Sequence, residues 1–312
     1  MRRAAAALCG LVLAASCTSS PAPLPRAAGR VPSLRHVWLF VLENHSYGGV
    51  IGNPDAPFLN QLAARYAIAD RSYAIMHPSL GNYLALVAGS TLGCASDSCA
   101  PQRGTSIAGQ LAARGRRWNA YLEGLPEPGW VGADRGAYVT RHDPFAYLTE
   151  VTGSPSMRAH LRPFTEFAAS LRDPPAFSLV VPDNDHNMHD GTVAQADRWM
   201  RAAVGAVLRS NAFARGGAIV ITWDEGLDGD HRGCCLRSIA GGRIATLVVA
   251  NGMVPGTHSS HPYTHYSVLA TIEDALGLPR LGLAADPHVS AMSDLWPIPS
   301  SPRSSPAGSA VP

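Results

Sequence analysis

The sequence contains no lysine, and all 25 of its basic residues are arginine. This absence excludes a P-loop lysine, a Schiff-base lysine and the Ser-x-x-Lys chemistry of β-lactamases. A cation that handles an anionic substrate must therefore be an arginine, a protonated histidine or a bound metal. The net charge of +2 is too small to favour nucleic acid or an anionic membrane surface as a partner.

The chain also lacks a long apolar run, because the apolar residues 4–15 are too few to span a bilayer. They follow a basic start, and residues 1–17 are therefore predicted to be a signal peptide. Residues 13–17 resemble a bacterial lipoprotein cleavage site with Cys17 as the lipidated residue. Ala14 stands where leucine is usual, so simple cleavage and secretion is the alternative. Either route predicts an exported bacterial protein in an oxidising compartment.

A globular chain is expected, because 46% of the 312 residues are hydrophobic and 15% are charged. One domain is expected, because no internal repeat and no low-complexity linker interrupts residues 35–296. Residues 18–34 are rich in Ser, Pro and Ala and are predicted to be a tether, residues 35–296 form the domain, and residues 297–312 are predicted to be a disordered tail. Cys94 and Cys99 are the favoured disulfide pair among the four cysteines of the domain. A zinc site is the competing interpretation, although a second Cys-x-x-Cys motif is missing.

Apolar blocks and helical patterns alternate along this domain. Short continuous apolar runs are typical of buried strands, and apolar residues three or four positions apart are typical of helices. We predict strands over residues 36–42, 176–181, 218–223 and 243–250. We predict helices over residues 57–66, 82–88, 105–114, 194–208 and 266–276. The alternation predicts an α/β fold with a mostly parallel sheet.

Two of the predicted strands end in a pair of oxygen-donor side chains. Glu43-Asn44 follows the first strand, and Asp224-Glu225 follows the strand over residues 218–223. The carboxyl ends of parallel strands meet at one edge of a sheet, where ligand sites lie. Four such donors suit a divalent cation, and Asp183 ends a third strand. The alternative is a surface turn with solvated acids.

Ser79 precedes the predicted helix over residues 82–88. A helix N-terminus favours an anion, either a phosphate or the serine alkoxide. Serine is a poor nucleophile until a base or a metal lowers its pKa, and the two acidic strand ends offer such a metal site. The alternative is that Ser79 only caps the helix. The nucleophile elbow Gly-x-Ser-x-Gly is missing around Ser79, which argues against an α/β-hydrolase triad.

Residues 183–191 form the densest polar stretch of the chain, with two histidines and three aspartates. Such a mixture can bind metal, hold phosphate or act as a general acid. His265 opens the last predicted helix and is either a functional histidine or a surface capping residue. The pair Arg141-His142 either contacts an anion or is a plain surface pair.

The motif Glu43-Asn44-His45-Ser46-Tyr47 resembles the E-N-x-S-[FY] opening of a bacterial phosphoesterase family, which contains phospholipases C and secreted acid phosphatases. Later blocks follow in the family's order, namely His77-Pro78-Ser79, Asn187-Met188-His189-Asp190-Gly191, Thr222-Trp223-Asp224-Glu225 and His265-Tyr266-Ser267. The resemblance covers roughly residues 36–296 and is nearest to the short secreted acid phosphatases. Gly81 stands where a proline is common, and His186-Asn187 replaces the usual Asn-Asp.

This resemblance implies an alkaline-phosphatase-like, three-layer α/β/α sandwich and one divalent metal ion as cofactor. It makes Ser79 the nucleophile. The implied metal ligands are Glu43, Asn44, Asp224 and Glu225, and the residues implied in phosphate binding or proton transfer are His189, Asp190 and His265. Further substrate contacts are expected from His77, Asn82, Arg141, His142 and His186. Oxygen-rich ligation admits Ca, Mg, Mn, Fe or Zn.

These observations predict an exported, metal-dependent acid phosphatase that hydrolyses phosphate monoesters through a phosphoserine intermediate. Phosphatidylinositol 3-phosphate is a candidate substrate. The first alternative is a phosphodiesterase of the phospholipase C type. The second is a surface lipoprotein that binds phosphorylated ligands without catalysis. We expect no nucleic-acid partner, and membrane contact only through a lipid anchor on Cys17.

Overall fold

The computed structural model describes residues 30–236 and 239–296. The predicted signal peptide with Cys17, most of the tether and the predicted tail lie outside these residues. The last part of the predicted tether, residues 30–34, packs onto the domain: Val31 is buried, and the N–H of Leu34 donates to the carbonyl oxygen of Ala275 at 2.8 Å. The folded domain therefore begins before residue 35. Within the described ranges, no helix is both long and apolar enough to cross a membrane.

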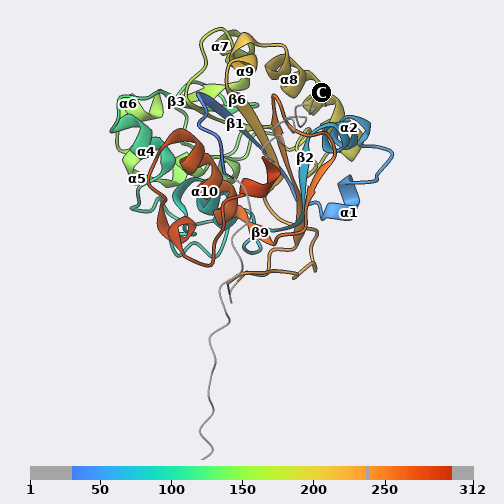
Figure 1. Cartoon of the computed structure of the whole chain (residues 1–312). Helices are drawn as coiled ribbons and strands as arrows, with labels where there is room; N and C mark the ends of the chain where they lie inside the picture. Colours follow the sequence, from blue (N-terminus) through green and yellow to red (C-terminus); the bar gives the residue numbers. More distant parts are fainter. Residues whose placement is uncertain (1–29, 237–238, 297–312) are drawn as a thin grey trace, which may run out of the picture.

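A nine-stranded sheet runs through the middle of the described domain (Figure 1). Its order is β4-β3-β5-β1-β6-β7-β2-β8, and β9 also pairs with β2. The strands are β1 (His36–Leu42), β2 (Ala67–Tyr73), β3 (Trp118–Leu122), β4 (Leu161–Pro163), β5 (Phe177–Val181), β6 (Gly217–Trp223), β7 (Arg243–Ala250), β8 (Thr257–Ser259) and β9 (Tyr263–Thr264).

Most neighbouring strands are parallel, as the sequence predicts. Strands β4, β3, β5, β1 and β6 run the same way, and only β7 pairs antiparallel, with both β6 and β2. Two antiparallel pairings in succession restore the direction, so β2 and its parallel partner β9 run with β1. The residues that follow β3, β5, β1, β6, β2 and β9 therefore all leave the same edge of the sheet.

Helices cover both faces of the sheet and make the three predicted layers. One core joins β1, β5 and β6 to α3, α4 and α10, and a second core joins the opposite strand faces to α2, α7, α8 and α9. The α-helices are α1 (Tyr47–Val50), α2 (Pro57–Arg65), α3 (Leu80–Ala88), α4 (Ile107–Ala112), α5 (Thr149–Thr152), α6 (Pro155–Arg158), α7 (Phe167–Ser170), α8 (Val193–Leu208), α9 (Asn211–Ala214) and α10 (His265–Leu276). Short 3-10 turns are η1 (Thr140–His142), η2 (Pro144–Tyr147), η3 (Phe164–Glu166), η4 (Gly282–Ala285) and η5 (Ser293–Leu295).

All nine predicted elements are present within a few residues of their expected ends. The predictions missed β2, β3 and β4 and the short strands β8 and β9. β2 and β3 carry polar residues inside their runs, such as Asp70 and Asn119. A strand interrupted in this way does not give a continuous apolar pattern.

Two disulfides close local loops of the described chain. Cys94 is bonded to Cys99, which is the predicted pair. Cys234 is bonded to its sequence neighbour Cys235, and no zinc site forms among these cysteines in the residues that the structure describes.

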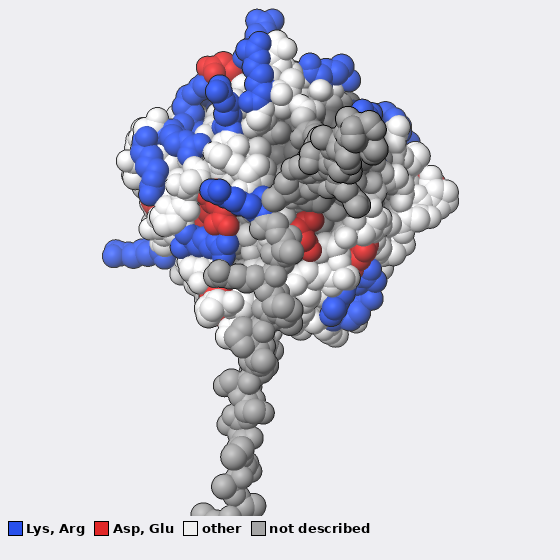
Figure 2. All heavy atoms as spheres, viewed as in Figure 1, with Lys and Arg blue, Asp and Glu red and all other residues white. Residues whose placement is uncertain are grey.

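The visible surface carries mixed charge. Figure 2 shows arginines spread over this face, with a few acidic side chains between them.

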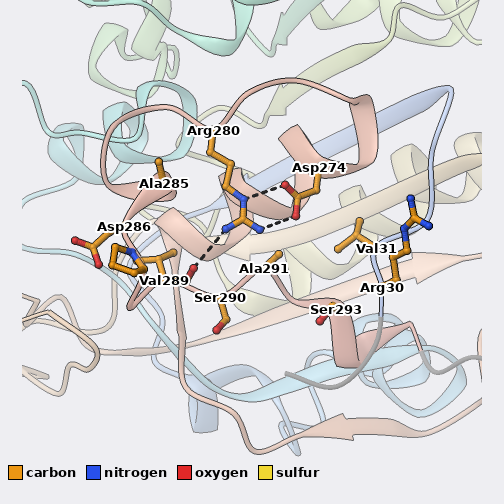
Figure 3. Close-up of a pocket in the computed structure, with 11 residues that line it drawn as sticks. Arg30, Val31, Asp274, Arg280, Ala285, Asp286, Val289, Ser290, Ala291 and Ser293 are labelled. Atoms are coloured by element: carbon orange, nitrogen blue, oxygen red, sulfur yellow. Dashed lines mark hydrogen bonds and ion pairs between the residues drawn. The ribbon is translucent and has the colours of Figure 1, made fainter. Parts of the chain in front are cut away.

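The C-terminal end of α10 borders an open surface pocket of about 300 Å³ (Figure 3). Arg280 crosses this pocket and forms two hydrogen bonds with the carboxylate of Asp274, at 2.9 and 2.6 Å. None of the residues that line the pocket belongs to the acidic strand ends. The pocket is therefore separate from the predicted site.

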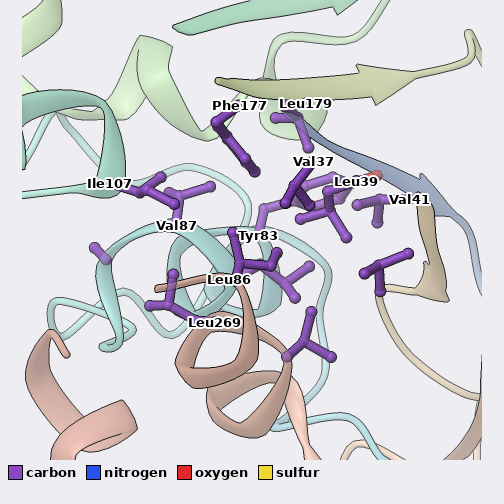
Figure 4. Close-up of a cluster of buried hydrophobic side chains, with 14 of the residues drawn as sticks. Val37, Leu39, Val41, Tyr83, Leu86, Val87, Ile107, Phe177, Leu179 and Leu269 are labelled. Carbon is purple, nitrogen blue, oxygen red and sulfur yellow. The ribbon is translucent and has the colours of Figure 1, made fainter. Parts of the chain in front are cut away.

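The inner side of α10 packs against α3 and the sheet (Figure 4). Leu269 of α10 lies close to Leu86 of α3, and both face Val37 and Leu39 of β1. All four side chains are at most 2% exposed. This packing fixes the N-terminus of α3, which carries Ser79, over the end of the sheet.

Glu273 of α10 is fully buried, and its Oε1 accepts the N–H of Leu281 at 3.0 Å. Burial raises the pKa of Glu273 from 4.5 to about 8. The folded protein thus keeps the carboxyl proton where the unfolded chain has lost it. This contribution to stability is fully present below about pH 4.5 and is lost as pH rises through about 8.

We predict that Glu273→Gln removes the loss of stability that Glu273 causes at high pH, because the amide stays neutral at every pH. The free energy of unfolding in urea should then fall less between pH 5 and pH 8.5 than it does in the parent protein. The exposed Glu127, changed to Gln, is the matched control and should leave the pH dependence unaltered. Parallel pH curves for the parent and Glu273→Gln would contradict the burial argument.

Candidate active site

Two acidic strand ends lie side by side at the carboxyl edge of the sheet. β1 and β6 pair in register as far as Leu42 opposite Trp223, so the next residues, Glu43 and Asp224, also meet. The N–H of Asn44 donates to Oδ1 of Asp224 at 3.0 Å. Asn44 has a left-handed φ of 44°, which asparagine tolerates better than most residues.

Ser79 reaches this edge from β2. Residues 74–78 lead from the end of β2 to Ser79, which occupies the N-cap position of α3. Its Oγ lies 3.2 Å from Oε2 of Glu43 and 3.5 Å from Oε1 of Glu225. Only 3% of Ser79 is exposed. The structure therefore brings Ser79 together with both acidic strand ends, as the sequence predicts.

Asn82 holds the loop that presents Ser79. Its Oδ1 accepts the N–H groups of Ile75 and Met76 at 2.8 and 3.1 Å, and its Nδ2 donates to the carbonyl oxygen of Met76 at 2.7 Å. The side chain is fully buried. The sequence prediction gives Asn82 a substrate contact, whereas its amide is already engaged by backbone groups of the loop.

Tyr83 and His142 hold Glu43 from two sides. The hydroxyl of Tyr83, four residues after Ser79, donates to Oε1 of Glu43. The two rings stack with centroids 5.4 Å apart, and Nε2 of His142 lies 3.3 Å from Oε2 of Glu43. Burial lowers the pKa of His142 well below its usual value, and the charges of Arg141 and His189 act in the same direction.

His77 contacts the remaining acid. Its Nδ1 lies 2.8 Å from Oε2 of Glu225, and its Nε2 lies 3.1 Å from the carbonyl oxygen of Asp230. A carbonyl oxygen can only accept, so Nε2 carries a proton.

The carboxyl groups of this cluster are costly to ionise. Burial, and next the charge of Asp224, raises the pKa of Glu43 well above its usual value. Burial likewise raises the pKa of Asp224, and burial with the charge of Asp224 raises the pKa of Glu225 to about 9. Removing water from anions without supplying positive charge is unfavourable.

The same cluster fits a divalent cation. Among the described residues, Oδ1 of Asn44 and Oδ2 of Asp224 are buried and have no hydrogen-bond partner. Oxygen atoms of this kind are the ligands that hard and borderline cations prefer. Glu43, Asn44, Asp224 and Glu225 therefore place oxygen donors at one edge of the sheet, and some of these oxygens have no hydrogen-bond partner among the described residues.

A second group of side chains lies at the more open side of His142. The rings of His142 and His189 are 6.1 Å apart, Nδ1 of His189 lies 2.6 Å from Oδ1 of Asp190, and Nε2 of His189 lies 3.4 Å from Nη2 of Arg141. The hydrogen bond from His189 lowers the pKa of Asp190. Arg141, His189 and Asp190 are thus one connected group next to the buried cluster.

Asp97 occupies the N-terminus of α3, where we expected an anion of the substrate. Its Oδ1 accepts the N–H of Leu80 at 3.0 Å, and its Oδ2 lies 3.6 Å from Nε of Arg141. The first free amide of the helix is therefore engaged by a carboxylate of the chain itself.

Among the described residues, two predicted histidines form no hydrogen bond or ion pair with Ser79, Glu43 or Glu225. His265 is fully buried, its Nε2 donates to the carbonyl oxygen of Trp223 at 2.9 Å, and burial lowers its pKa to about 4. His186 contacts Glu123 and Asp183 instead of the Ser79 cluster. The interpretation of His265 as an exposed capping residue is wrong, because the residue is inaccessible.

The sequence analysis missed Tyr83, Asp97 and Glu123 as contributors. The sequence could have indicated Tyr83, because it lies four residues after Ser79 and residues four apart share one face of a helix. Glu123 directly follows β3, but β3 was not among the predicted strands, so the rule used for the other strand ends did not reach Glu123. Asp97 lies in a loop without a regular pattern, and the sequence carries no signal for its contact with α3.

Sequence comparison finds relatives along most of the chain. The profile of the Phosphoesterase family matches residues 49–279. A phosphatidylinositol-3-phosphatase of Mycobacterium tuberculosis is 33% identical over 299 residues, which is 94% of each chain. An acid phosphatase of Aspergillus fumigatus is 28% identical over 261 residues, and the match covers 79% of this chain and 55% of the fungal protein. The chain thus spans little more than half of the fungal relative.

Comparison with solved structures supports the predicted fold. A protein of the alkaline phosphatase superfamily from Vibrio parahaemolyticus superposes with a TM-score of 0.54 at 12% identity, over 85% of this chain and 71% of that protein. At this identity the likeness concerns the fold alone. The prediction of an alkaline-phosphatase-like α/β/α sandwich is confirmed.

Proposed function

Because the chain belongs to the Phosphoesterase family, we propose that it is a metal-dependent acid phosphatase whose nucleophile is Ser79. The proposed substrates are phosphate monoesters. Phosphatidylinositol 3-phosphate is a candidate, because the mycobacterial relative is named a phosphatidylinositol-3-phosphatase. Export, with lipidation of Cys17 or without it, stays part of the proposal.

The position of the Ser79 hydroxyl is the observation that carries this proposal. Its Oγ lies within 3.5 Å of a carboxylate oxygen from each acidic strand end. A serine placed between buried carboxylates has acceptors for its proton on both sides. A structural serine at a helix start would instead bond to the backbone of its own helix, and Ser79 makes no such side-chain bond.

The proposed reaction begins with attack of Ser79 Oγ on phosphorus, in line with the leaving oxygen. The serine proton passes to Oε2 of Glu43 or Oε1 of Glu225, the bond from phosphorus to the leaving oxygen breaks, and a phosphoserine forms. Water then hydrolyses the phosphoserine and releases inorganic phosphate. Positioning and electrostatic stabilisation supply most of what phosphoryl transfer requires.

The residues of the open side have separate tasks in this scheme. His189, held by Asp190 at 2.6 Å, protonates the leaving alkoxide. Arg141 binds a non-bridging phosphoryl oxygen, because its guanidinium lies beside His189, with Nη2 3.4 Å from Nε2. His142 stays neutral in its buried position and orients Glu43.

Glu43, Asn44, Asp224 and Glu225 would hold one divalent cation. When bound, such an ion supplies Lewis acidity, which lowers the pKa of the serine hydroxyl and offsets negative charge on the phosphoryl group. Tyr83 and His142 fix the carboxylate of Glu43, as partners of metal ligands commonly do.

We predict that Ser79→Ala lowers kcat/KM for p-nitrophenyl phosphate by at least about 10³-fold, because it removes the covalent route. Thermal unfolding should be nearly unchanged, since the Ser79 hydroxyl supports no backbone group. Rapid acid quenching of the parent enzyme should yield a Ser79-phosphorylated peptide by mass spectrometry. Near-normal activity of the alanine variant would remove Ser79 as the nucleophile.

We also predict that chelation abolishes turnover. Treatment with EDTA followed by gel filtration should reduce p-nitrophenyl phosphate hydrolysis at least about 100-fold, and added divalent metal should restore it. Asp224→Asn should lower the activity and weaken this restoration. A rate that survives exhaustive chelation would count against the cation.

A third prediction separates monoesters from diesters. A diester must bring a second esterified oxygen to a serine that is 3% exposed, so monoesters should react faster. Phosphate release from phosphatidylinositol 3-phosphate should therefore exceed phosphocholine release from phosphatidylcholine by at least about 100-fold in kcat/KM. Dominant phosphocholine release would favour the phospholipase C alternative. Binding of both lipids without hydrolysis would favour the non-catalytic one.

A further inference from the structure

A second cluster of potential metal ligands lies along the same sheet edge, at the ends of β3 and β5, and β5 is the neighbour of β1. Glu123 follows β3 directly, and Asp183 lies two residues beyond β5. These strands are parallel neighbours, with Leu122 opposite Val181, and the N–H of Glu123 donates to the carbonyl oxygen of Val181 at 3.0 Å. The sheet therefore places the two carboxylates together.

His186 completes this cluster. Its Nδ1 lies 3.1 Å from Oε2 of Glu123 and 3.2 Å from Oδ1 of Asp183. One ligand atom from each of the three side chains lies within 4.8 Å of the other two. The backbone fixes this geometry, because the N–H of His186 donates to the carbonyl oxygen of Asp183 at 3.0 Å.

The cluster is short of positive charge. Oδ1 of Asp183 is sealed from solvent and has no hydrogen-bond donor among the described residues. A cavity of about 10 Å³ lies against Glu123, Asp183 and His142, and a space of this size holds about one water molecule or ion. Only two of the three ligand side chains border it. The cavity therefore has room for a water ligand beside an ion that Glu123, Asp183 and His186 hold.

We propose that Glu123, Asp183 and His186 form a second divalent-cation site, distinct from the Ser79 cluster. One imidazole and two carboxylates suit a borderline ion such as Zn²⁺ or Mn²⁺, with water in the remaining positions. Neutral His186 would bind through Nδ1, the atom that already faces both carboxylates.

The ion's role is to fasten residues 183–191 to the end of β3. This loop reaches the Ser79 cluster through the carbonyl oxygen of Asn187, which accepts the N–H of Glu43 at 2.9 Å. The loop also carries His189, which lies beside Arg141 in the neighbouring group. A cation at the start of the loop would therefore steady its later residues. The site itself does not depend on the proposed phosphatase activity.

A protonated His186 bridging both carboxylates is the competing explanation. It would satisfy the same oxygens without any metal. The two explanations differ in metal stoichiometry, which is measured directly.

The experiment is equilibrium dialysis of the EDTA-stripped, folded protein against Zn²⁺, followed by elemental analysis. The parent should bind two equivalents. His186→Ala and Glu123→Gln should each bind one, and so should Asp224→Asn, which alters the Ser79 cluster. The double variant Asp224→Asn/His186→Ala should bind none. His288→Ala is the matched control, because His288 pairs with Asp286 alone at 3.0 Å, and it should bind two.

Thermal unfolding of Asp224→Asn gives an independent readout. Zn²⁺ should raise its midpoint, and the added change His186→Ala should remove that rise. Unchanged stoichiometry and unchanged Zn²⁺ stabilisation in both His186→Ala and Glu123→Gln would overturn the proposal and leave the ion-pair explanation. One equivalent in the parent that is lost in His186→Ala but kept in Asp224→Asn would support this site while contradicting the cation at the Ser79 cluster.

Discussion

Negative charge held away from water is the constraint on which this end of the molecule depends. β1 and β6 pair in register to their last residues, so Glu43 and Asp224, which follow them, lie next to each other. Repulsion between carboxylates grows as the surroundings lose water. The hydroxyl groups of Ser79 and Tyr83 donate to these carboxylates, and hydroxyl groups bring no positive charge. The divalent cation that we propose for this edge of the sheet would offset the negative charge of these carboxylates.

The sequence predicted the parts of this arrangement that depend on local pattern. Continuous apolar runs identified β1 and β6, and the acids that follow them marked the sheet edge. A local apolar pattern does not indicate whether a strand runs parallel or antiparallel to its neighbours. β7 is buried along nearly its whole length, so its composition resembles that of a parallel strand although it runs antiparallel.

Other parts depend on pairings between distant residues and were out of reach. The contact of Asp97 with α3 and the ring stacking of His142 on Tyr83 join segments that no periodicity links. Asn82 shows a further limit. A polar residue beside a nucleophile resembles a substrate ligand, whereas here the unpaired backbone groups of a tight loop require its amide. The role becomes evident only when the hydrogen bonds of the loop are traced.

The pairing of β1 with β6 also bears on when the site forms. Ser79 and Glu225 are 146 positions apart, and Asn44 and Asp224 are 180 apart. Contacts so distant in sequence close slowly, because a long loop must be ordered before they form. During synthesis β1 stays without one of its two central neighbours until β6 has emerged. The Ser79 cluster is therefore assembled late, and a truncated chain that ends before residue 224 has the serine without its second acidic strand end.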